Sequence, residues 1–273
     1  MTAAARIATA TSPLILREDR EGIAVLVLNR PEQRNCLSEA MLLDITKTLA
    51  DIRDDKSIRA VIFTANGPAF SAGHDLKELT ARRSDKDGGR EYFRHIMMTC
   101  SAMMQAIVML PKPVIAAVQG IASAAGCQLV ASCDLAVAST SAKFATPGVD
   151  IGLFCSTPMV ALSRNVRRKH AMEMLLTGDA ASAEDAYRMG LVNRVVPAGK
   201  EREEALKFAR KIAGKSAHSV KIGKEGFYRQ AEMSLADAYR YVSEVMVENL
   251  LARDAEEGLN AFIEKRKPKW ENQ

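Results

Sequence analysis

Two runs of tiny residues, each lying between an apolar strand pattern and a helical pattern, constrain the fold of this chain most. They occupy residues 70–76 and 120–128. Tiny side chains allow main-chain N–H groups to come close to another backbone or to a ligand. Two turns of this kind that face one carbonyl oxygen would form an oxyanion hole. The pattern therefore predicts strand–turn–helix units whose turns carry main-chain donors.

Strand and helix patterns alternate through the first two hundred residues. Strands are expected at 14–17, 23–29, 60–65, 114–118, 134–138 and 191–196, and helices at 38–54, 91–110, 171–176 and 182–190. Residues 143–152 are expected to form a strand, a turn and a second strand, and the charged stretch 81–90 a mobile loop. From about residue 200 the strand pattern ends, and three or four helices fill residues 201–265. The chain is therefore predicted to be a mixed α/β protein with a helical tail.

Composition excludes several classes of protein. With 48% hydrophobic and 26% charged residues in 273, the chain can bury a sizeable core. Its net charge of +5 is diffuse, and no basic stripe interleaved with aromatic residues predicts nucleic-acid binding. No apolar run reaches the roughly 18–20 residues of a membrane span. The five cysteines are widely spread without zinc-site spacing, so they are expected to be reduced and buried, with no metal site.

An ordered set of landmarks identifies the family that this chain resembles. The landmarks are residues 28–31, 70–76, 112–120, 133–136, 176–179, 186–196, 257–262 and 265–268. Together they resemble the crotonase (enoyl-CoA hydratase/isomerase) superfamily over nearly the whole chain. Residues 120–133 and 144–158 are most similar to one branch of it, that of the enoyl-CoA hydratase domain-containing protein 3.

The resemblance implies a fold, a ligand and an assembly. The expected fold is a spiral of β-β-α units over residues 14–199, preceded by a flexible segment at 1–13 and followed by a C-terminal helical oligomerisation region at 200–273. The expected ligand is an acyl-CoA thioester, in which coenzyme A belongs to the substrate, so no separate cofactor is expected. The expected assembly is a homotrimer, with a dimer of trimers as a further form.

The resemblance also implies which residues bind the substrate. The thioester oxygen is expected to accept from the backbone N–H groups of His74 and Ala125, which would stabilise an enolate in the transition state. Ala125 stands where a glycine is common, a replacement that requires a negative φ at this position. The substrate-binding set comprises Ala72, His74, Asp75, Leu76, Lys77 and Ala125, with residues 74–77 lining the adenine end of the coenzyme.

The two acid–base positions of the family depart from its pattern. Hydratases of the family hold and activate water with two glutamates, and the matching positions here are Gln128 and Gly148. Glutamine orients water without transferring its proton, and glycine offers no functional group. Each missing acid–base group removes about 10²–10⁴-fold in rate. Efficient hydration of crotonyl-CoA by the usual mechanism is therefore not expected.

Three functional hypotheses follow from this departure. In the first, an enzyme uses relocated acid–base chemistry, with Asp150 as the first candidate because an extended strand would turn it away from the core. The further candidates are His74, Ser156 and Cys155. In the second, the protein binds acyl-CoA without efficient catalysis. In the third, a structural or regulatory oligomer keeps only a vestigial pocket, plugged by Phe154 or Met97.

The two ends of the chain bear on assembly and compartment. The predicted helix that begins at Ser234 carries an apolar face that must be covered by the body of the protein or by another subunit. The first acidic residue is Glu18, and the preceding segment weakly resembles an organelle transit peptide, with a plain disordered bacterial N-terminus as the equal alternative. The expected location is the cytoplasm in a bacterium and the mitochondrial matrix in a eukaryote.

Overall fold

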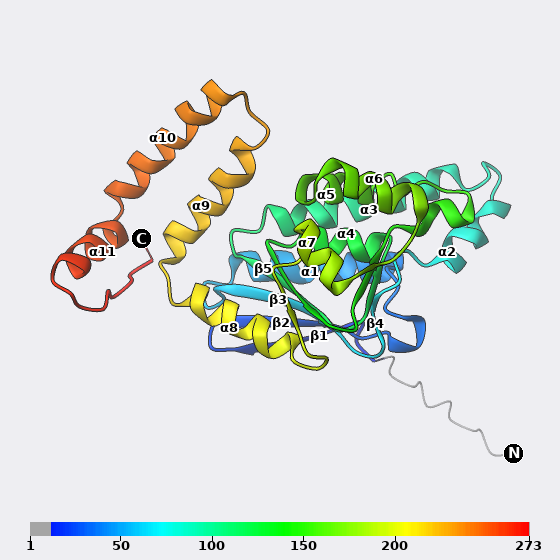
Figure 1. The fold of residues 1–273 in the computed structure, drawn as a ribbon, viewed down its shortest axis with the longest axis horizontal. Coiled ribbons are helices and arrows are strands. Elements are labelled where there is room, and N and C mark those ends of the chain that lie inside the picture. The colour runs from blue at the N-terminus through cyan, green and yellow to red at the C-terminus, as the bar shows by residue number, and fades with distance from the viewer. Residues whose placement is uncertain (1–11, 273) are drawn as a thin grey trace, which may run out of the picture.

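The computed structural model describes residues 12–272, which form two sheets surrounded by helices (Figure 1). Most of the predicted flexible segment 1–13 lies outside the described residues. The strands are β1 (Ile15–Arg20), β2 (Ile23–Leu28), β3 (Ala60–Ala65), β4 (Ala69–Ser71), β5 (Val114–Val118), β6 (Ile121–Ser123), β7 (Leu135–Ser139), β8 (Lys143–Ala145), β9 (Ala181–Ser182) and β10 (Arg194–Val196). The helices are α1 (Glu39–Asp54), α2 (Leu76–Ala81), α3 (Arg90–Val108), α4 (Ala125–Ser132), α5 (Pro158–Asn165), α6 (Arg168–Thr177), α7 (Ala183–Met189), α8 (Glu201–Ala213), α9 (Ala217–Gln230), α10 (Leu235–Leu251) and α11 (Arg253–Ile263).

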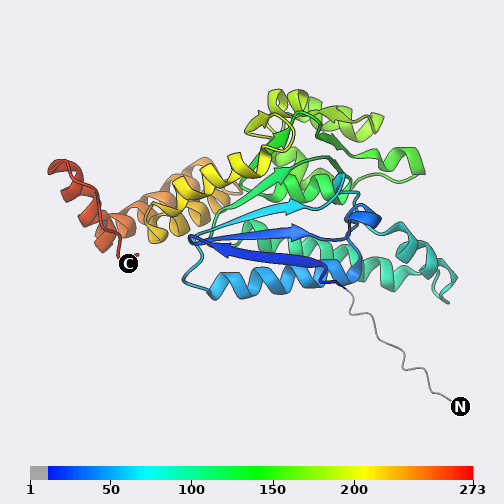
Figure 2. The ribbon, with the colours of Figure 1, turned by 90° about the horizontal axis from the view of Figure 1, so that it is seen from below.

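The inner strands β2, β3, β5 and β7 of the larger sheet are buried on both faces, which explains their apolar sequences. The order of this sheet is β1-β2-β3-β5-β7-β10, and all its pairs are parallel except β1 with β2. Alternate residues of β2 enter different core clusters: Ala24, Leu26 and Leu28 pack on the side of α1 and α3, and Ile23, Val25 and Val27 pack on the side of α8. Figure 2 shows the strands lying between these helical layers. A parallel sheet needs such cover on each face.

Strands of the smaller sheet alternate along the chain with strands of the larger one. The order of the smaller sheet is β4-β6-β8-β9, with the first three strands parallel. Each of these strands directly follows a strand of the larger sheet, so β3 leads to β4, β5 to β6 and β7 to β8. A helix then carries the chain back to the next turn. The predicted mixed α/β spiral of β-β-α units is therefore confirmed.

Two local predictions are wrong. The second half of residues 143–152 is a 3-10 helix at Pro147–Ile151, because Pro147 starts a tight turn that Gly152 ends in the left-handed conformation (φ 74°). The charged stretch 81–90 is partly helical, with α2 ending at Ala81 and a 3-10 turn at Arg82–Ser84. Both elements are too short for a hydrophobic period to be read from the sequence.

The helices α9, α10 and α11, called here the helical arm (residues 217–263), project to one side of the body (Figure 1). The apolar face of α10 remains open along much of its length. Leu235 is 76% exposed and Tyr239 is 67% exposed. The body of the same chain therefore leaves a large part of the predicted apolar face uncovered.

Candidate functional site

Three loops leave the smaller sheet at the same edge. Because β4, β6 and β8 are parallel neighbours, the segments that follow them emerge side by side. These segments are residues 72–75, 124–128 and 146–148. The fold therefore brings together the two small-residue runs and the position of the second missing glutamate, which are far apart in the sequence.

The two small-residue runs are in direct backbone contact. A Cβ atom added to Gly73 would lie 3.0 Å from the Ser123 carbonyl oxygen and 3.3 Å from the Ala125 nitrogen. A Cβ atom added to Gly126 would lie closer than 3.0 Å to the carbonyl oxygen of Ser71. Neither position has room for a side chain. The tiny residues are therefore needed for the packing of one segment against the other.

Each run presents a main-chain N–H group that has no acceptor within residues 12–272. The Gly73 carbonyl accepts from the Leu37 N–H at 2.7 Å, and in a trans peptide the adjoining N–H of His74 points the opposite way. Ala125 is the first residue of α4, where N–H groups have no partner within the helix. Among residues 12–272, neither N–H has a hydrogen-bond acceptor. Both groups are free to donate to a ligand.

The strained residue of this turn is Ala124 rather than Ala125. Ala124 has φ 48° and ψ −116°, a conformation that favours glycine, whereas Ala125 already lies in α4. The Ala124 N–H donates to the Ala145 carbonyl at 2.9 Å, which ties this turn to β8. Such backbone strain costs about 1–3 kcal/mol and persists only where the surroundings impose it. The replacement of the common glycine by Ala125 is therefore accommodated.

The two positions at which the resemblance predicts glutamates, 128 and 148, are both buried. Gln128 is 5% exposed, and its Oε1 has no hydrogen-bond partner within residues 12–272. A Cβ atom at Gly148 would lie 3.0 Å from Cys155 Sγ and 3.1 Å from the Leu153 carbonyl oxygen. The segment 153–155 therefore occupies the space beside Gly148, and a longer side chain there would have to displace it.

Asp150 lies in a different element from the one that the sequence predicts. It belongs to the 3-10 helix at Pro147–Ile151, so the predicted strand is wrong, although the side chain does face away from the core. Its carboxylate oxygens lie about 3 Å from the point where a Cβ atom of Gly178 would be, at the end of α6. The Asp150 side chain is exposed and packs toward α6. Its role in acid–base chemistry stays a prediction.

The ring of His74 lies near the backbone of Leu37, and burial lowers the pKa of the ring by more than this backbone raises it. Both ring nitrogens are buried, and neither has a hydrogen-bond partner among the described residues. Burial lowers the pKa of His74 below its usual value of 6.5. The side chain is therefore neutral at physiological pH, where it can accept or donate one hydrogen bond to a ligand.

The buried ring predicts that mild acid destabilises the protein. Because the folded-state pKa of His74 is below its unfolded value, the unfolded state binds more protons between the two values. The free energy of unfolding should therefore fall as the pH drops below about 6.5, by at most ~1.4 kcal/mol per pH unit. Denaturant titrations at about pH 7.5 and about pH 5.5 measure this slope. If the free energy of unfolding of His74→Asn fell as much between these two pH values as that of the wild type, His74 would not be the cause of the effect.

The other predicted substrate residues surround the start of α2. Asp75 is its N-cap, and its carboxylate accepts from the Lys77 N–H at 2.9 Å. Leu76 is 52% exposed, and Lys77 is exposed beside it. The Ala72 N–H donates to the Arg34 carbonyl at 2.9 Å, so its backbone is already engaged. Only the side chains of residues 76 and 77 extend freely into solvent.

Sequence reasoning missed Asn35, a fully buried side chain that braces this edge. Its Oδ1 accepts from the Arg30 N–H, and its Nδ2 donates to the carbonyls of Asn66 and Ala69, each at 2.8 Å. These bonds join the loop after β2 to the start of β4. Asn35 has φ 50°, a left-handed conformation that asparagine tolerates better than most residues. Its position after the Arg30-Pro31 turn was the only signal in the sequence.

The remaining predicted features are placed as follows. The five cysteines are free thiols, four of them buried and Cys36 half-buried. Phe154 is 40% exposed, and Met97 is half-buried against the core. Residues 12–272 bring together no group of three or more His, Cys, Asp or Glu side chains that could hold a metal ion. None of the helices described is long and apolar enough to cross a membrane.

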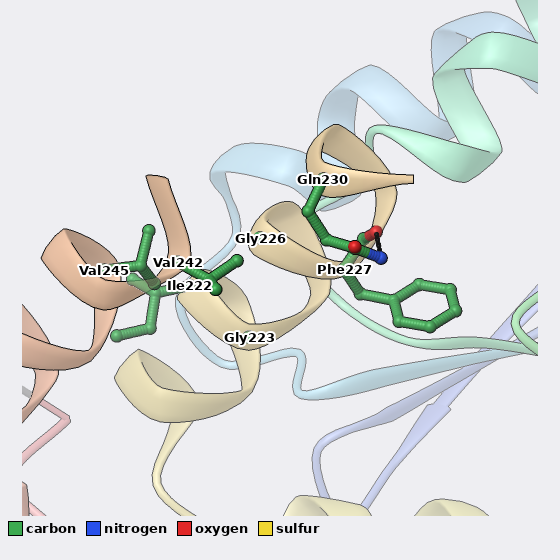
Figure 3. Close-up of a pocket in the computed structure, with 7 residues that line it drawn as sticks. All are labelled: Ile222, Gly223, Gly226, Phe227, Gln230, Val242 and Val245. Atoms are coloured by element: carbon green, nitrogen blue, oxygen red, sulfur yellow. Dashed lines mark hydrogen bonds between the residues drawn. The ribbon is translucent and has the colours of Figure 1, made fainter. Parts of the chain in front are cut away.

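A separate apolar cavity lies within the helical arm. It has a volume of about 330 Å³ between α9 and α10. Figure 3 shows Val242 and Val245 of α10 beside Ile222 of α9, whereas Phe227 turns away from them. No charged side chain lines this cavity, so it lacks the groups that acid–base chemistry needs.

Comparisons with known proteins cover almost the whole chain. Residues 18–273 match the enoyl-CoA hydratase/isomerase family. A Xenopus laevis protein named enoyl-CoA hydratase domain-containing protein 3, mitochondrial, is 51% identical over 259 residues, which are 95% of this chain and 86% of the relative. A crystal structure of an enoyl-CoA hydratase from Mycobacterium smegmatis has a TM-score of 0.90 at 49% identity, covering 94% of this chain and 99% of that one. The human enoyl coenzyme A hydratase domain-containing protein 3 has a TM-score of 0.90 at 48% identity, covering 94% and 100%.

Proposed function

Because this chain belongs to the enoyl-CoA hydratase/isomerase (crotonase) family, in the branch of the domain-containing protein 3, we propose that it binds acyl-CoA thioesters at the edge after β4, β6 and β8. The thioester oxygen accepts from the N–H groups of His74 and Ala125. The observation that carries this proposal is the backbone contact of Gly73 with residues 123–125, which keeps both free donors on touching segments.

The two donors suit a reaction that builds negative charge on the thioester oxygen. An enolate carries more charge on this oxygen than the ground-state carbonyl, so fixed N–H groups stabilise it preferentially. Removal of one donor from such a site costs about 2.7–4 kcal/mol. The site therefore supports enolate chemistry once a proton can be removed or delivered.

The site lacks an evident side chain for proton transfer. Gln128 can hold a water molecule through its unpartnered Oε1 but cannot take the proton. Gly148 offers no side chain, and Cys155 borders the space beside it. Burial also raises the pKa of Cys155, which keeps the thiol protonated. We therefore expect slow hydration of crotonyl-CoA, with Asp150 as the residue proposed to carry any relocated acid–base chemistry.

The coenzyme portion of the ligand is proposed to lie along residues 72–77. Leu76 and Lys77 are exposed there, so their side chains are available to the adenine end and to its phosphates. Asp75 orients the first turn of α2 rather than the ligand. Coenzyme A is part of the substrate, so the proposal includes no separate cofactor.

Self-association is proposed to cover the open face of the helical arm. Leu235 is 76%, Leu251 76% and Phe262 84% exposed, which is unusual for large apolar side chains. A homotrimer, paired into a dimer of trimers in one form, is the proposed assembly. The protein is proposed to work in the mitochondrial matrix if it is eukaryotic and in the cytoplasm if it is bacterial. The name of the Xenopus relative describes that protein as mitochondrial.

The experiment that tests the proposal separates binding from turnover. Calorimetry with butyryl-CoA should show a complex at micromolar concentration, and a crotonyl-CoA hydration assay should show slow turnover by the wild type. Gln128→Glu together with Gly148→Glu should increase the rate once the segment 153–155 moves aside for the new side chain, because each acid–base group contributes about 10²–10⁴-fold. Gly148→Ala is the matched control, since it tests the contact with Cys155 without adding an acid.

The possible results distinguish the hypotheses. Failure to bind butyryl-CoA at micromolar concentration would refute the proposal. Rapid hydration by the wild type would refute the part that assigns slow turnover to the missing glutamates. Turnover lost in Asp150→Asn would support relocated chemistry. Binding with no turnover in either protein would favour the alternative of a non-catalytic or regulatory acyl-CoA-binding oligomer, which the filled space beside Gly148 also favours.

A further inference from the structure

A second cavity, of about 440 Å³, opens at the opposite end of the larger sheet. Its lining includes Ile58 and Arg59, which precede β3, and Pro111 and Lys112, which precede β5. The proposed thioester site instead follows strands that continue from the other ends of β3 and β5. The two sites are therefore on opposite edges of the fold.

Five cationic side chains line this cavity: Arg53, Lys56, Arg59, Lys112 and Lys221. Within residues 12–272, none of them lies within 4.0 Å of a carboxylate oxygen. Nearby acids are engaged elsewhere, since Asp55 pairs with Arg17 at 3.2 Å and Glu271, which also lines the cavity, pairs with Arg253 at 3.4 Å. Within the described residues these cations therefore have no carboxylate in direct contact, although Asp54 and Asp55 act on Lys112, and Asp254 acts on Arg59, over a longer distance.

Two of the cations are fixed by main-chain carbonyl groups. Lys112 Nζ donates to the carbonyls of Ile52 and Asp55, and Arg59 Nη2 donates to that of Lys215 at 2.5 Å. Burial lowers the pKa of both Lys112 and Arg59, which reflects the cost of holding these charges away from water. Their other N–H groups remain available. Partly desolvated cations without a carboxylate in direct contact strengthen a hydrogen bond to an incoming anion.

The rest of the lining is apolar or belongs to the end of the chain. Ile58, Ile212 and Val220 supply apolar surface. Asn272 closes one side, and its N–H donates to the buried carboxylate of Asp254 at 3.0 Å. The first turn of α9 also faces the cavity, and the positive end of its dipole favours an anion. A ligand that suits this lining has a compact apolar or ring portion and more than one negative charge.

We propose that this cavity binds a compact organic phosphate with two or more negative charges, of the nucleoside diphosphate class. Arg59 and Lys112 form the fixed part of the anion site, and Arg53, Lys56 and Lys221 close on the ligand from the rim. The apolar residues pack against its base or sugar. This site is separate from the proposed thioester site and does not depend on it.

The test is calorimetry with ADP in a buffer free of phosphate and of low ionic strength, on the full-length protein. Wild type should bind ADP, and Lys56→Glu/Lys221→Glu should weaken that binding by about tenfold to a hundredfold, since charge-assisted hydrogen bonds are lost. Lys47→Glu/Lys211→Glu is the matched control, because both lysines are exposed, lie outside the lining and cause the same change in net charge. The control should bind ADP as the wild type does.

Several outcomes would overturn the proposal. No binding of ADP at millimolar concentration, or equal weakening in both double variants, would do so. If inorganic pyrophosphate bound as tightly as ADP, the apolar lining would not contribute to binding, and the proposal of an organic phosphate would be wrong. Loss of butyryl-CoA binding in Lys56→Glu/Lys221→Glu would show that these residues serve the thioester ligand. Unchanged butyryl-CoA binding in that variant, together with loss of ADP binding, would support a separate site.

Discussion

Replacement of Lys224 by methionine is expected to lower the free energy of unfolding by about 3–5 kcal/mol, because it leaves a largely buried carboxylate without its cation. The side chain of Lys224 is 7% exposed and that of Asp134 is 16% exposed, with 2.7 Å between Nζ and Oδ2. Lys224 Nζ also donates to the carbonyls of Ile107 and Lys112, each at 3.1 Å. These contacts hold α9, the first helix of the arm, against the body.

Asp134 accepts hydrogen bonds from three different segments of the chain. Its Oδ2 accepts from the Val114 N–H at 2.7 Å, and its Oδ1 accepts from the Tyr228 hydroxyl at 2.9 Å. One carboxylate thus joins the starts of β5 and β7 to α9. Loss of Lys224 affects both the interior of the sheet and the attachment of the arm.

Denaturant unfolding of Lys224→Met measures the effect, with Lys211→Met as the control on an exposed lysine of α8, expected within about 0.5 kcal/mol of wild type. The double variant Lys224→Met/Asp134→Asn should lose less stability than the sum of the single variants, since it removes both charges. Additive losses would mean that the two side chains act independently, contrary to their geometry.

The second large effect is expected at Gly126. In most helices, alanine in place of glycine adds roughly 0.5–1 kcal/mol of stability. In α4 the added Cβ would collide with the carbonyl oxygen of Ser71. It would also lie only 2.8 Å from the Cβ atom of Ser71. Neither backbone segment can move alone, because β4 is paired with β6. Gly126→Ala should therefore lose about 1–3 kcal/mol of stability, as overpacked cores do.

This substitution should also disturb the proposed thioester site. A forced separation of residues 71–74 from residues 124–126 moves the His74 and Ala125 N–H groups apart. Displacements of about 1 Å cost on the order of 10²-fold in sites that depend on positioning. Calorimetry with butyryl-CoA on Gly126→Ala tests this expectation at a temperature where the variant remains folded.

Gly223→Ala is the matched control for Gly126→Ala. Gly223 lies inside α9, and nothing lies within 4 Å of its missing Cβ. We expect this variant to keep or gain stability and to bind butyryl-CoA as the wild type does. Wild-type stability and affinity in Gly126→Ala would mean that the two runs tolerate a wider spacing, and would remove the steric reason for their small residues.

Much of the architecture could be predicted from the sequence. The strands at 23–29, 60–65 and 114–118 were visible because a parallel strand buried on both faces is apolar at each position. The helix at Glu39–Asp54 was visible because its period of 3.6 persists over four turns and Ser38 caps it. The short elements could not be predicted, since α2 and the 3-10 helix at Pro147–Ile151 hold too few residues to show a hydrophobic period.

For the candidate site, the sequence by itself determined which residues are tiny and that positions 128 and 148 carry no acid. Glycine at 73 and 126 and the absence of carboxylates at 128 and 148 are properties of residue type, which needs no coordinates. Only the tertiary structure decided that Cys155 occupies the space beside Gly148 and that the strain falls on Ala124. It alone paired Lys224 with Asp134, 90 residues away in the chain. Such contacts depend on how distant segments pack, and a local pattern of residues carries no information about them.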